Sequence, residues 1–275
     1  LSAEQVEQLA GRIVENLREP FHVRDVVVAL TASVGLATVL DEAVRAALDP
    51  IVHVSSMVVV FPPEGERLSS EDPVREHRLA YPRSKSAAER TVRRFQETGA
   101  PVVSIYPGSV QGPLDPTLGQ YAQNLIRSLQ TGFVLISEGG FPCVDVRDVA
   151  TLCARAIEAG RGPRRYMLGG PFVGNAELAD ILYRLTGREL RRIVVPGSVL
   201  RGLGRLGDVF RRITGVNPKL SYEAALILTR SVPCDDSRAA RELGVVPRAA
   251  EESLRDMLLW LHREGVLRAA DVGTL

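Results

Sequence analysis

The sequence has few cysteines. The three that are present, Cys143, Cys153 and Cys234, stand far apart and belong to no CxxC pair and no Cys/His pattern. Their number and spacing exclude a disulfide framework and give no sign of a structural zinc site. We expect these thiols to be small buried side chains in a reducing cytoplasm.

An excess of one charge and a long apolar run are also missing. The chain holds 34 basic and 33 acidic residues, and a net charge of +1 creates no field that favours nucleic acid. No apolar run approaches the ~18 residues of a membrane span. Glutamates in the first segment argue against a signal peptide or an N-terminal membrane anchor. These absences predict a soluble cytoplasmic protein without nucleic-acid or membrane partners.

The chain instead shows an alternation of helical and extended patterns. A hydrophobic fraction of 45% in 275 residues is enough for a sizeable core. Strands separated by helices predict right-handed βαβ crossovers, and hence an α/β fold with a largely parallel sheet. Helices are expected at 3–18, 39–48, 82–97, 145–159, 176–187, 197–213, 221–229 and 251–265, and strands within 22–37 and at 51–61, 101–106, 164–170 and 191–196.

A candidate catalytic pair lies in the segment YPRSK, where one of these helices starts. Tyr81 and Lys85 are four residues apart, so on a helix both side chains lie on one face, one turn apart. A phenol has a pKa of about 10, and a neighbouring ammonium lowers that pKa by favouring the phenolate. Tyr81 is therefore a candidate acid/base, although a surface tyrosine and lysine would show the same spacing.

A second candidate group is a pair of hydroxyls at the end of the preceding strand. The segment VHVSS contains Ser55 and Ser56, and Ser56 stands 25 positions before Tyr81 in the sequence. A hydroxyl there could hydrogen-bond the substrate oxygen whose proton Tyr81 takes or returns.

The order of these segments resembles the extended short-chain dehydrogenase/reductases, the NAD-dependent epimerase/dehydratase group. VHVSS, then YxxxK, then PVVSIYPGSVQGP, GGFPCVDVRDVATLCARAIE and the C-terminal segments match that family over residues 39–275. The resemblance implies NAD or NADP as cofactor and a secondary alcohol or ketone as the small-molecule substrate, with oxidoreductase or epimerase/dehydratase chemistry. A homodimer formed through two helices is usual in such proteins, and the sequence leaves the oligomeric state open.

The same resemblance assigns roles to individual residues. Ser56 would orient the substrate hydroxyl or carbonyl, with Ser55 as the alternative. Tyr81 would be the acid/base, and Lys85 would hold the nicotinamide ribose and lower the pKa of the tyrosine. The PGxV turn, which lines the nicotinamide in the family, corresponds to Pro107, Gly108, Ser109 and Val110.

Other patterns have simpler explanations. Gly202, Gly204 and Gly207 have the spacing GxGxxG, but they lie inside an amphipathic helical pattern with no strand before it, so we expect no phosphate loop there. Asp145 and Asp148 stand at a helix start, where carboxylates cap the helix. No metal site is predicted, because no ligand spacing links the histidines at 22, 53, 77 and 262.

The glycine-rich turn TGxxGxxG, with which the family begins, does not occur in this sequence. In the family, backbone amides of that turn receive the dinucleotide pyrophosphate at a helix N-terminus. We therefore expect a truncated Rossmann-like sheet with helices on both faces, a small C-terminal α/β module on the substrate side, and weak or absent dinucleotide binding. Two functional classes stay open: an enzyme, or a non-catalytic remnant or binding module.

The first 37 residues resemble the C-terminal end of a diguanylate cyclase (GGDEF) domain, in which a helix ending in EPF precedes a hairpin ending in TASVGLA. That resemblance places a seam near Ala37 and Thr38. The alternative assigns VRDVVVALTAS to the fourth strand of the reductase itself. The preferred division is a cyclase-like fragment over 1–37, a truncated catalytic half over 38–150 and an interleaved substrate-side module over 151–275.

Overall fold

The computed structural model describes residues 21–23, 26–28, 33–115, 117–214 and 221–275. The chain divides into two compact units, residues 1–48 and residues 49–275. The helix expected over residues 3–18 lies outside the described residues.

The first unit contains a short hairpin and a helix. Strands β1 (Phe21–Val23) and β2 (Val26–Val28) pair antiparallel, in agreement with the one or two strands predicted in this region. Helix α2 spans Ser33–Arg45. The extended structure predicted up to Ala37 was therefore wrong for its last five residues.

Helix α2 starts early because the helical spacing of apolar residues extends further back than Val39. Leu36, Leu40 and Ala43 recur at intervals of four and three. The helix is continuous across Ala37 and Thr38, where the sequence had suggested a seam.

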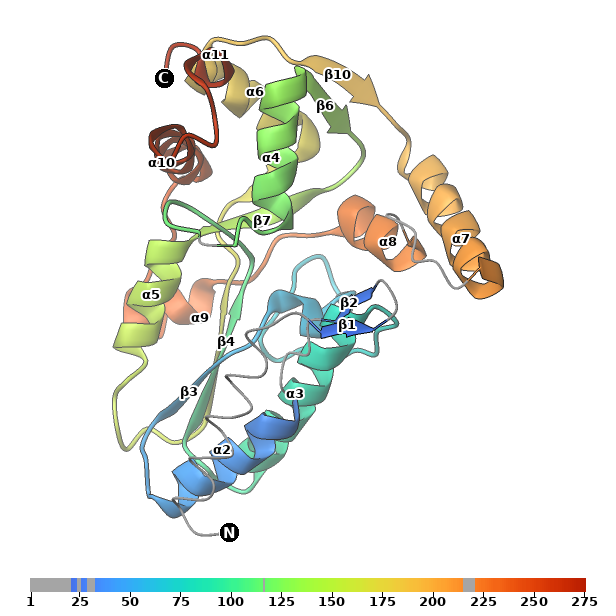
Figure 1. Ribbon diagram of the computed structural model, residues 1–275. Helices are drawn as coiled ribbons and strands as arrows, with labels where there is room; N and C mark the ends of the chain where they lie inside the picture. The colour runs from blue at the N-terminus through green and yellow to red at the C-terminus, as the bar shows by residue number, and fades with distance from the viewer. Residues whose placement is uncertain (1–20, 24–25, 29–32, 116, 215–220) are drawn as a thin grey trace. The chain divides into compact units, whose positions relative to one another are not determined.

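The second unit is built around a parallel sheet with the strand order β3-β4-β8 (Figure 1). Both neighbouring pairs are parallel, as predicted. The strands are β3 (Ile51–Val54), β4 (Val102–Pro107) and β8 (Arg164–Leu168).

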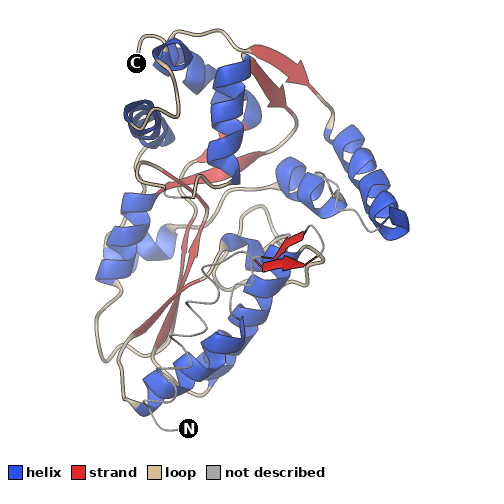
Figure 2. Ribbon diagram, in the orientation of Figure 1, coloured by secondary structure: helices blue, strands red, loops and turns tan. Residues whose placement is uncertain are grey.

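Helices cover both faces of this sheet, because side chains of β4 alternate between the faces. Val103 and Ile105 belong to a buried cluster with residues of α5 (Val146–Arg155) and α9 (Ser237–Leu243). Ser104 and Tyr106, in contrast, are hydrogen-bonded to α3 (Ala80–Glu97). Figure 2 shows the strands between these helices. The α/β fold class is thereby confirmed.

The rest of the second unit holds a second three-stranded sheet, a two-stranded sheet and six further helices among the described residues. Strand β7 pairs parallel with β5 and antiparallel with β9, and β6 pairs parallel with β10. The strands are β5 (Ser109–Gln111), β6 (Phe133–Ile136), β7 (Gly140–Asp145), β9 (Phe172–Gly174) and β10 (Arg191–Val194). The helices are α4 (Gln120–Thr131), α6 (Asn175–Thr186), α7 (Gly197–Thr214), α8 (Tyr222–Arg230), α10 (Ala250–Arg263) and α11 (Ala269–Val272).

Two expectations from the sequence are confirmed in this unit. Spacings of three and four between Leu254, Met257, Leu258 and Leu261 predict one inward-facing helical stripe, and Asp145 is expected to cap a helix. The stripe of α10 packs inward, and Leu254, Met257, Leu258 and Leu261 are all buried. Asp145 caps α5 by accepting a hydrogen bond from the Arg147 backbone N–H, at 2.8 Å.

The strand predicted from Ile51 to Phe61 is shorter than expected. Strand β3 ends at Val54, and Met57–Val60 forms a buried 3-10 turn, η1. The Ser56 hydroxyl accepts a hydrogen bond from the Val58 backbone N–H at 3.3 Å, and so caps this turn. Because a serine hydroxyl satisfies a free backbone N–H, it favours the turn over continued strand despite the β-branched residues.

A buried carboxylate ties α3 to the sheet. Glu89 is 0% exposed. Its Oε1 accepts a hydrogen bond from the Tyr106 hydroxyl at 2.6 Å and a longer one from Arg93 Nε at 3.4 Å. His53 Nε2 of β3 lies 3.6 Å from Glu89 Oε2. Glu89 thus joins the helix to two strands of the sheet.

The surroundings of Glu89 favour its ionised form. Burial alone would raise its pKa, but the nearby polar groups of His53, Tyr106 and Ser55 outweigh burial, and the pKa lies below the ordinary glutamate value. Burial and the adjacent carboxylate together raise the pKa of Tyr106, which therefore stays protonated as the donor.

We predict that Glu89→Gln destabilises the protein by about 3 kcal/mol at neutral pH, because it removes a buried hydrogen-bonded charge. A carboxylate with a lowered pKa contributes its full stability above its ordinary pKa, and the contribution is lost as the pH falls through the lower, folded-state pKa. The difference between the parent chain and Glu89→Gln should therefore be largest above about pH 4.5 and should shrink in more acidic solution. Urea denaturation over a series of pH values measures it.

Glu97→Gln is the matched control, since Glu97 is an exposed residue at the end of the same helix. It should leave stability within about 0.5 kcal/mol of the parent chain. Equal stability losses for the two variants, or a loss for Glu89→Gln that is independent of pH, would contradict the assignment.

Candidate active site

The carboxyl ends of the parallel strands bring two of the candidate segments, VHVSS and PGSV, to one edge of the sheet. Strand β3 ends immediately before Ser55, and β4 ends at Pro107. The Ser55 backbone N–H donates to the Ile105 carbonyl at 2.8 Å, so the two strand ends are directly joined. Turn η1, which follows Ser56, packs against α3. Ligands of open α/β sheets bind at this edge.

Tyr81 and Lys85 occupy the first two turns of α3, as the spacing predicted. Tyr81 is 54% exposed and Lys85 is half-buried. Within the described residues the Lys85 ammonium makes no ion pair or hydrogen bond at ordinary distances, so its donors stay available to a ligand.

Partial burial changes the acidity of Lys85. Desolvation lowers the pKa of its ammonium, and the charge of Glu89, one turn further along α3, opposes that shift. The chain uses arginine almost everywhere else, and Lys85 is one of only two lysines. Unlike arginine, a half-buried lysine carries a compact charge with an adjustable pKa.

The two serines have different surroundings. Ser55 is buried, and its hydroxyl is one of the groups that lower the pKa of Glu89. Ser56 is partly exposed and its oxygen caps η1, which leaves the hydroxyl proton free to donate. Ser56 is therefore the better placed of the two to meet a substrate. That Ser56 and Tyr81 share a substrate oxygen stays a prediction.

The PGSV segment turns the chain between β4 and β5. A Cβ atom on Gly108 would lie 2.6 Å from the Gly169 carbonyl oxygen and 2.9 Å from the Gly169 Cα, so only glycine allows the two backbones to approach so closely. Pro107 and Ser109 are buried, whereas Val110 is 44% exposed. Val110 therefore offers the accessible apolar surface of this turn.

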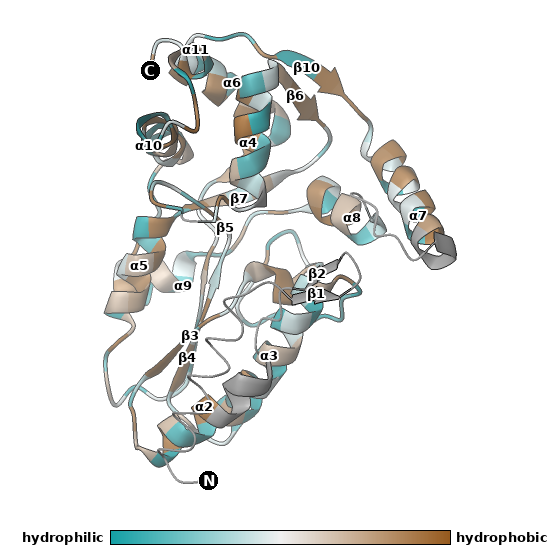
Figure 3. Cartoon of the chain, viewed as in Figure 1, coloured by the Kyte–Doolittle hydropathy of each residue, from teal (hydrophilic) through white to brown (hydrophobic). Residues whose placement is uncertain are grey.

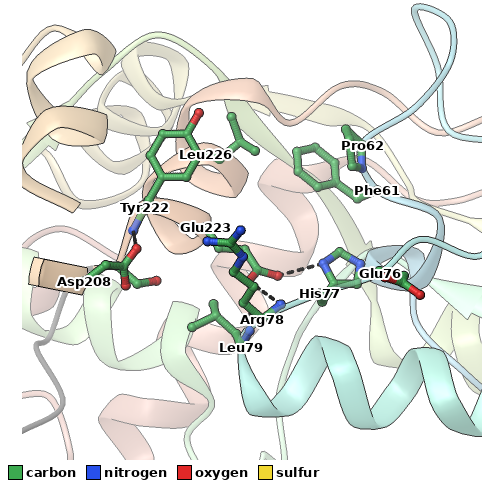
Figure 4. Close-up of a pocket in the computed structure, with 11 residues that line it drawn as sticks. Phe61, Pro62, Glu76, His77, Arg78, Leu79, Asp208, Tyr222, Glu223 and Leu226 are labelled. Atoms are coloured by element: carbon green, nitrogen blue, oxygen red, sulfur yellow. Dashed lines mark hydrogen bonds and ion pairs between the residues drawn. The ribbon is translucent and has the colours of Figure 1, made fainter. Parts of the chain in front are cut away.

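A cavity of about 430 Å³ opens beside the N-terminus of α3. Its walls come from the segment after η1, the segment before α3, and helices α7 and α8 (Figure 4). One side is apolar and aromatic and the other is charged. The lining residues are Phe61, Pro62, Glu76, His77, Arg78, Leu79, Asp208, Ser221, Tyr222, Glu223 and Leu226.

Glu223 of α8 organises the charged side of this cavity. Its Oε2 accepts hydrogen bonds from the backbone N–H groups of Arg78 and Leu79, at 2.9 and 2.8 Å, and its Oε1 lies 2.7 Å from His77 Nδ1. Leu79 has no capping side chain of its own, so a carboxylate from a distant helix satisfies the amides that precede α3. Sequence reasoning did not find Glu223 or this cavity, because no local pattern links residues 144 to 146 positions apart.

Other candidate chemistry is absent from the described part of the chain. The three cysteines are free, and burial raises the pKa of Cys143 to about 12, which disfavours a nucleophilic thiolate. The described residues hold no cluster of three or more acidic, histidine or cysteine side chains that could bind a metal. None of the helices described is long and apolar enough to cross a membrane. The GxGxxG spacing lies within α7, not in a loop.

Comparison with known proteins places this geometry in a family. The model of the NAD dependent epimerase/dehydratase family matches residues 22–169. That match includes residues 22–37 and extends across the expected seam, which favours the alternative in which VRDVVVALTAS belongs to the reductase. The cyclase resemblance and the truncation stay expectations from the sequence.

Individual relatives agree with the family match. The chain is 27% identical over 245 residues to sterol demethylase protein B of Methylococcus capsulatus, covering 85% of this chain and 73% of that protein. It is 24% identical over 242 residues to a putative dihydroflavonol 4-reductase of Synechocystis, covering 85% and 70%. The crystal structure of gox2253 superposes with a TM-score of 0.74 at 22% identity, covering 90% of this chain and 78% of that one. The chain belongs to the NAD-dependent epimerase/dehydratase family, the extended short-chain dehydrogenase/reductases.

Proposed function

We propose that this protein is an NAD(P)-dependent oxidoreductase that acts on a secondary alcohol or ketone. The observation that carries the proposal is the pairing of an accessible Tyr81 with a half-buried Lys85 one turn away, on a helix that starts beside a cavity. Epimerase or dehydratase chemistry would use the same tyrosine. We favour simple oxidoreduction, because one of the relatives is named a reductase.

In this proposal Tyr81 moves the proton at the substrate oxygen. During alcohol oxidation its phenolate oxygen accepts the hydroxyl proton, and during ketone reduction its hydroxyl returns a proton to the carbonyl oxygen. Lys85, one turn away, would supply the positive charge that this proton transfer needs beside the substrate. Ser56 would donate a hydrogen bond to the same substrate oxygen and hold it in line with Tyr81.

The dinucleotide would supply the hydride donor or acceptor when bound. The free donors of Lys85 suit the ribose hydroxyls beside the nicotinamide, and the exposed Val110 of the PGSV turn suits the flat face of the ring. These groups fit the nicotinamide end only. Since TGxxGxxG does not occur in the sequence, and the glycines of α7 lie in a helix, we expect the pyrophosphate to be held weakly.

The cavity beside α3 suits a substrate with both an apolar body and polar groups. Phe61, Tyr222 and Leu226 would contact the apolar body, and Arg78 and Glu223 would face its polar groups (Figure 4). The names of the relatives supply two test substrates, a sterol with a secondary alcohol and a dihydroflavonol with a ketone.

We predict that Tyr81→Phe lowers kcat by about 10²- to 10⁴-fold with little change in KM, because it removes the acid/base and keeps the ring. Turnover is measured with saturating NAD⁺ or NADP⁺ for the sterol alcohol, and with saturating NADH or NADPH for the dihydroflavonol ketone. Tyr183→Phe is the matched control, since Tyr183 is also 54% exposed but lies on α6. Equal activity in Tyr81→Phe and the parent chain would contradict the proposed role of Tyr81.

We predict that the 275-residue chain binds NADH and NADPH more weakly than the micromolar range, and that Lys85→Met weakens this binding further. Losing the pyrophosphate anchor removes positioning as well as affinity, so turnover should need a high dinucleotide concentration. Fluorescence titration gives the affinity, with Lys219→Met as the control because Lys219 is the other lysine.

The outcomes of this titration separate the two functional classes. Weak binding that depends on Lys85, together with turnover that depends on Tyr81, supports the enzyme. Micromolar binding in both lysine variants would show that the dinucleotide is anchored elsewhere. No turnover of either test substrate at saturating dinucleotide, with binding unaffected by Lys85→Met, would favour a binding module that has lost catalysis.

A further inference from the structure

The cavity beside α3 contains a guanidinium that has no partner among the described residues. Arg78 lines this cavity, and its side chain stands among the other lining residues in Figure 4. Its backbone N–H donates to Glu223, but its guanidinium makes no hydrogen bond or ion pair with the described part of the chain. Nearby arginines are engaged, since Arg75 pairs with Glu64 and Arg93 donates to the backbone carbonyl of residue 72. The charge of Arg78 is therefore available to a ligand.

The acidic side chains of the same cavity already have partners. Glu223 accepts the two backbone N–H groups that precede α3, and its other oxygen faces His77, whose side chain is 3% exposed. Asp208 accepts a hydrogen bond from the Tyr222 backbone N–H at 3.2 Å. The side chain of Glu76 is 96% exposed and lies 3.9 Å from an arginine of α3. A positively charged ligand group is therefore a poorer match to this lining than a negatively charged one.

The remaining wall of the cavity is apolar. Phe61, Pro62 and Leu226 contribute to it, and Figure 3 shows hydrophobic and hydrophilic residues side by side along α8. A volume of about 430 Å³ lies within the range of small-molecule sites. An apolar wall with one available cation suits a ligand that has an apolar body and a single anionic group.

We propose that Arg78 selects substrates that carry a carboxylate, so that the substrate of this protein is an acidic alcohol or ketone with an apolar body. This inference rests on the proposed function, because it takes Tyr81 as the group that meets the reacting oxygen. Arg78 and Tyr81 are three peptide units apart, so their Cα atoms lie within about 11 Å and one small molecule can reach both. The planar guanidinium of arginine matches a carboxylate through two parallel hydrogen bonds. A phosphate dianion is less well suited, because one cation offsets only part of its charge.

Isothermal titration calorimetry with a matched pair of aromatic ketones, 4-benzoylbenzoate and 4-benzoylbenzamide, tests the proposal. The two probes share one apolar body and differ in charge. We expect the parent chain to bind the carboxylate at least about tenfold more tightly than the amide, and Arg78→Gln to abolish that difference, because the charge-assisted hydrogen bonds are lost. Raised salt should weaken binding of the carboxylate and leave binding of the amide unchanged. Arg78→Lys should keep part of the preference, since it retains the charge without the planar fork.

Arg83→Gln is the matched control, because Arg83 is an exposed arginine of α3 that does not line the cavity. It should bind both probes as the parent chain does. Equal affinities of the parent chain for the two probes, a preference that Arg78→Gln leaves intact, or no binding of the carboxylate at millimolar concentration would overturn the proposal.

A turnover assay separates this inference from the proposed function. Both ketones are offered with saturating NADH or NADPH to the parent chain and to Tyr81→Phe. Binding of the carboxylate that depends on Arg78, without any turnover that depends on Tyr81, would contradict the proposed catalysis and would still support the anion preference. Turnover of both ketones with equal kcat/KM would support the catalysis and contradict the selection by Arg78.

Discussion

The candidate site depends on the hydrogen bond between the buried carboxylate of Glu89 and the Tyr106 hydroxyl. Glu89 stands on the same helix as Tyr81 and Lys85, one turn after the lysine, and it is hydrogen-bonded to Tyr106 of the central strand. A buried charge is tolerated only where hydrogen bonds replace water, and here they do so with enough strength to keep the pKa of Glu89 below its usual value. Helix α3 is therefore held in one orientation against the sheet. The candidate residues Tyr81 and Lys85 lie on this same helix.

A second carboxylate holds the N-terminal end of the same helix. Glu223 of α8 accepts hydrogen bonds from the backbone N–H groups of Arg78 and Leu79. The start of α3, where Tyr81 lies, is thus attached to the wall of the cavity, while the middle of the helix is attached to the sheet. The proton transfer proposed for Tyr81 would need such support, because a small displacement of the group from its substrate costs a large part of the rate.

Features set by local periodicity were predictable from the sequence. The helices from Ala80 and Ala250, the strand from Val102 and the one-turn spacing of Tyr81 and Lys85 follow from residue patterns within about twenty positions. Features set by distant contacts were not. The early end of β3 depends on a serine cap that competes with β-branched residues, and the cavity depends on Glu223, far along the chain. Periodicity shows that Val199, Leu203, Leu206 and Phe210 share one face of α7, but it does not show whether that face points to the core or to solvent.

The most direct test of this account is the pKa of Lys85, because that value depends on how α3 holds the lysine. The chain has two lysines, so reductive methylation with carbon-13 and an NMR pH titration give few signals, and Lys219→Arg identifies Lys85. The account predicts that the Lys85 pKa lies below the ordinary lysine value of about 10.4, and that Glu89→Gln lowers it further, because the Glu89 charge opposes the effect of burial. An ordinary or raised pKa, or one that Glu89→Gln leaves unchanged, would contradict the arrangement described for α3.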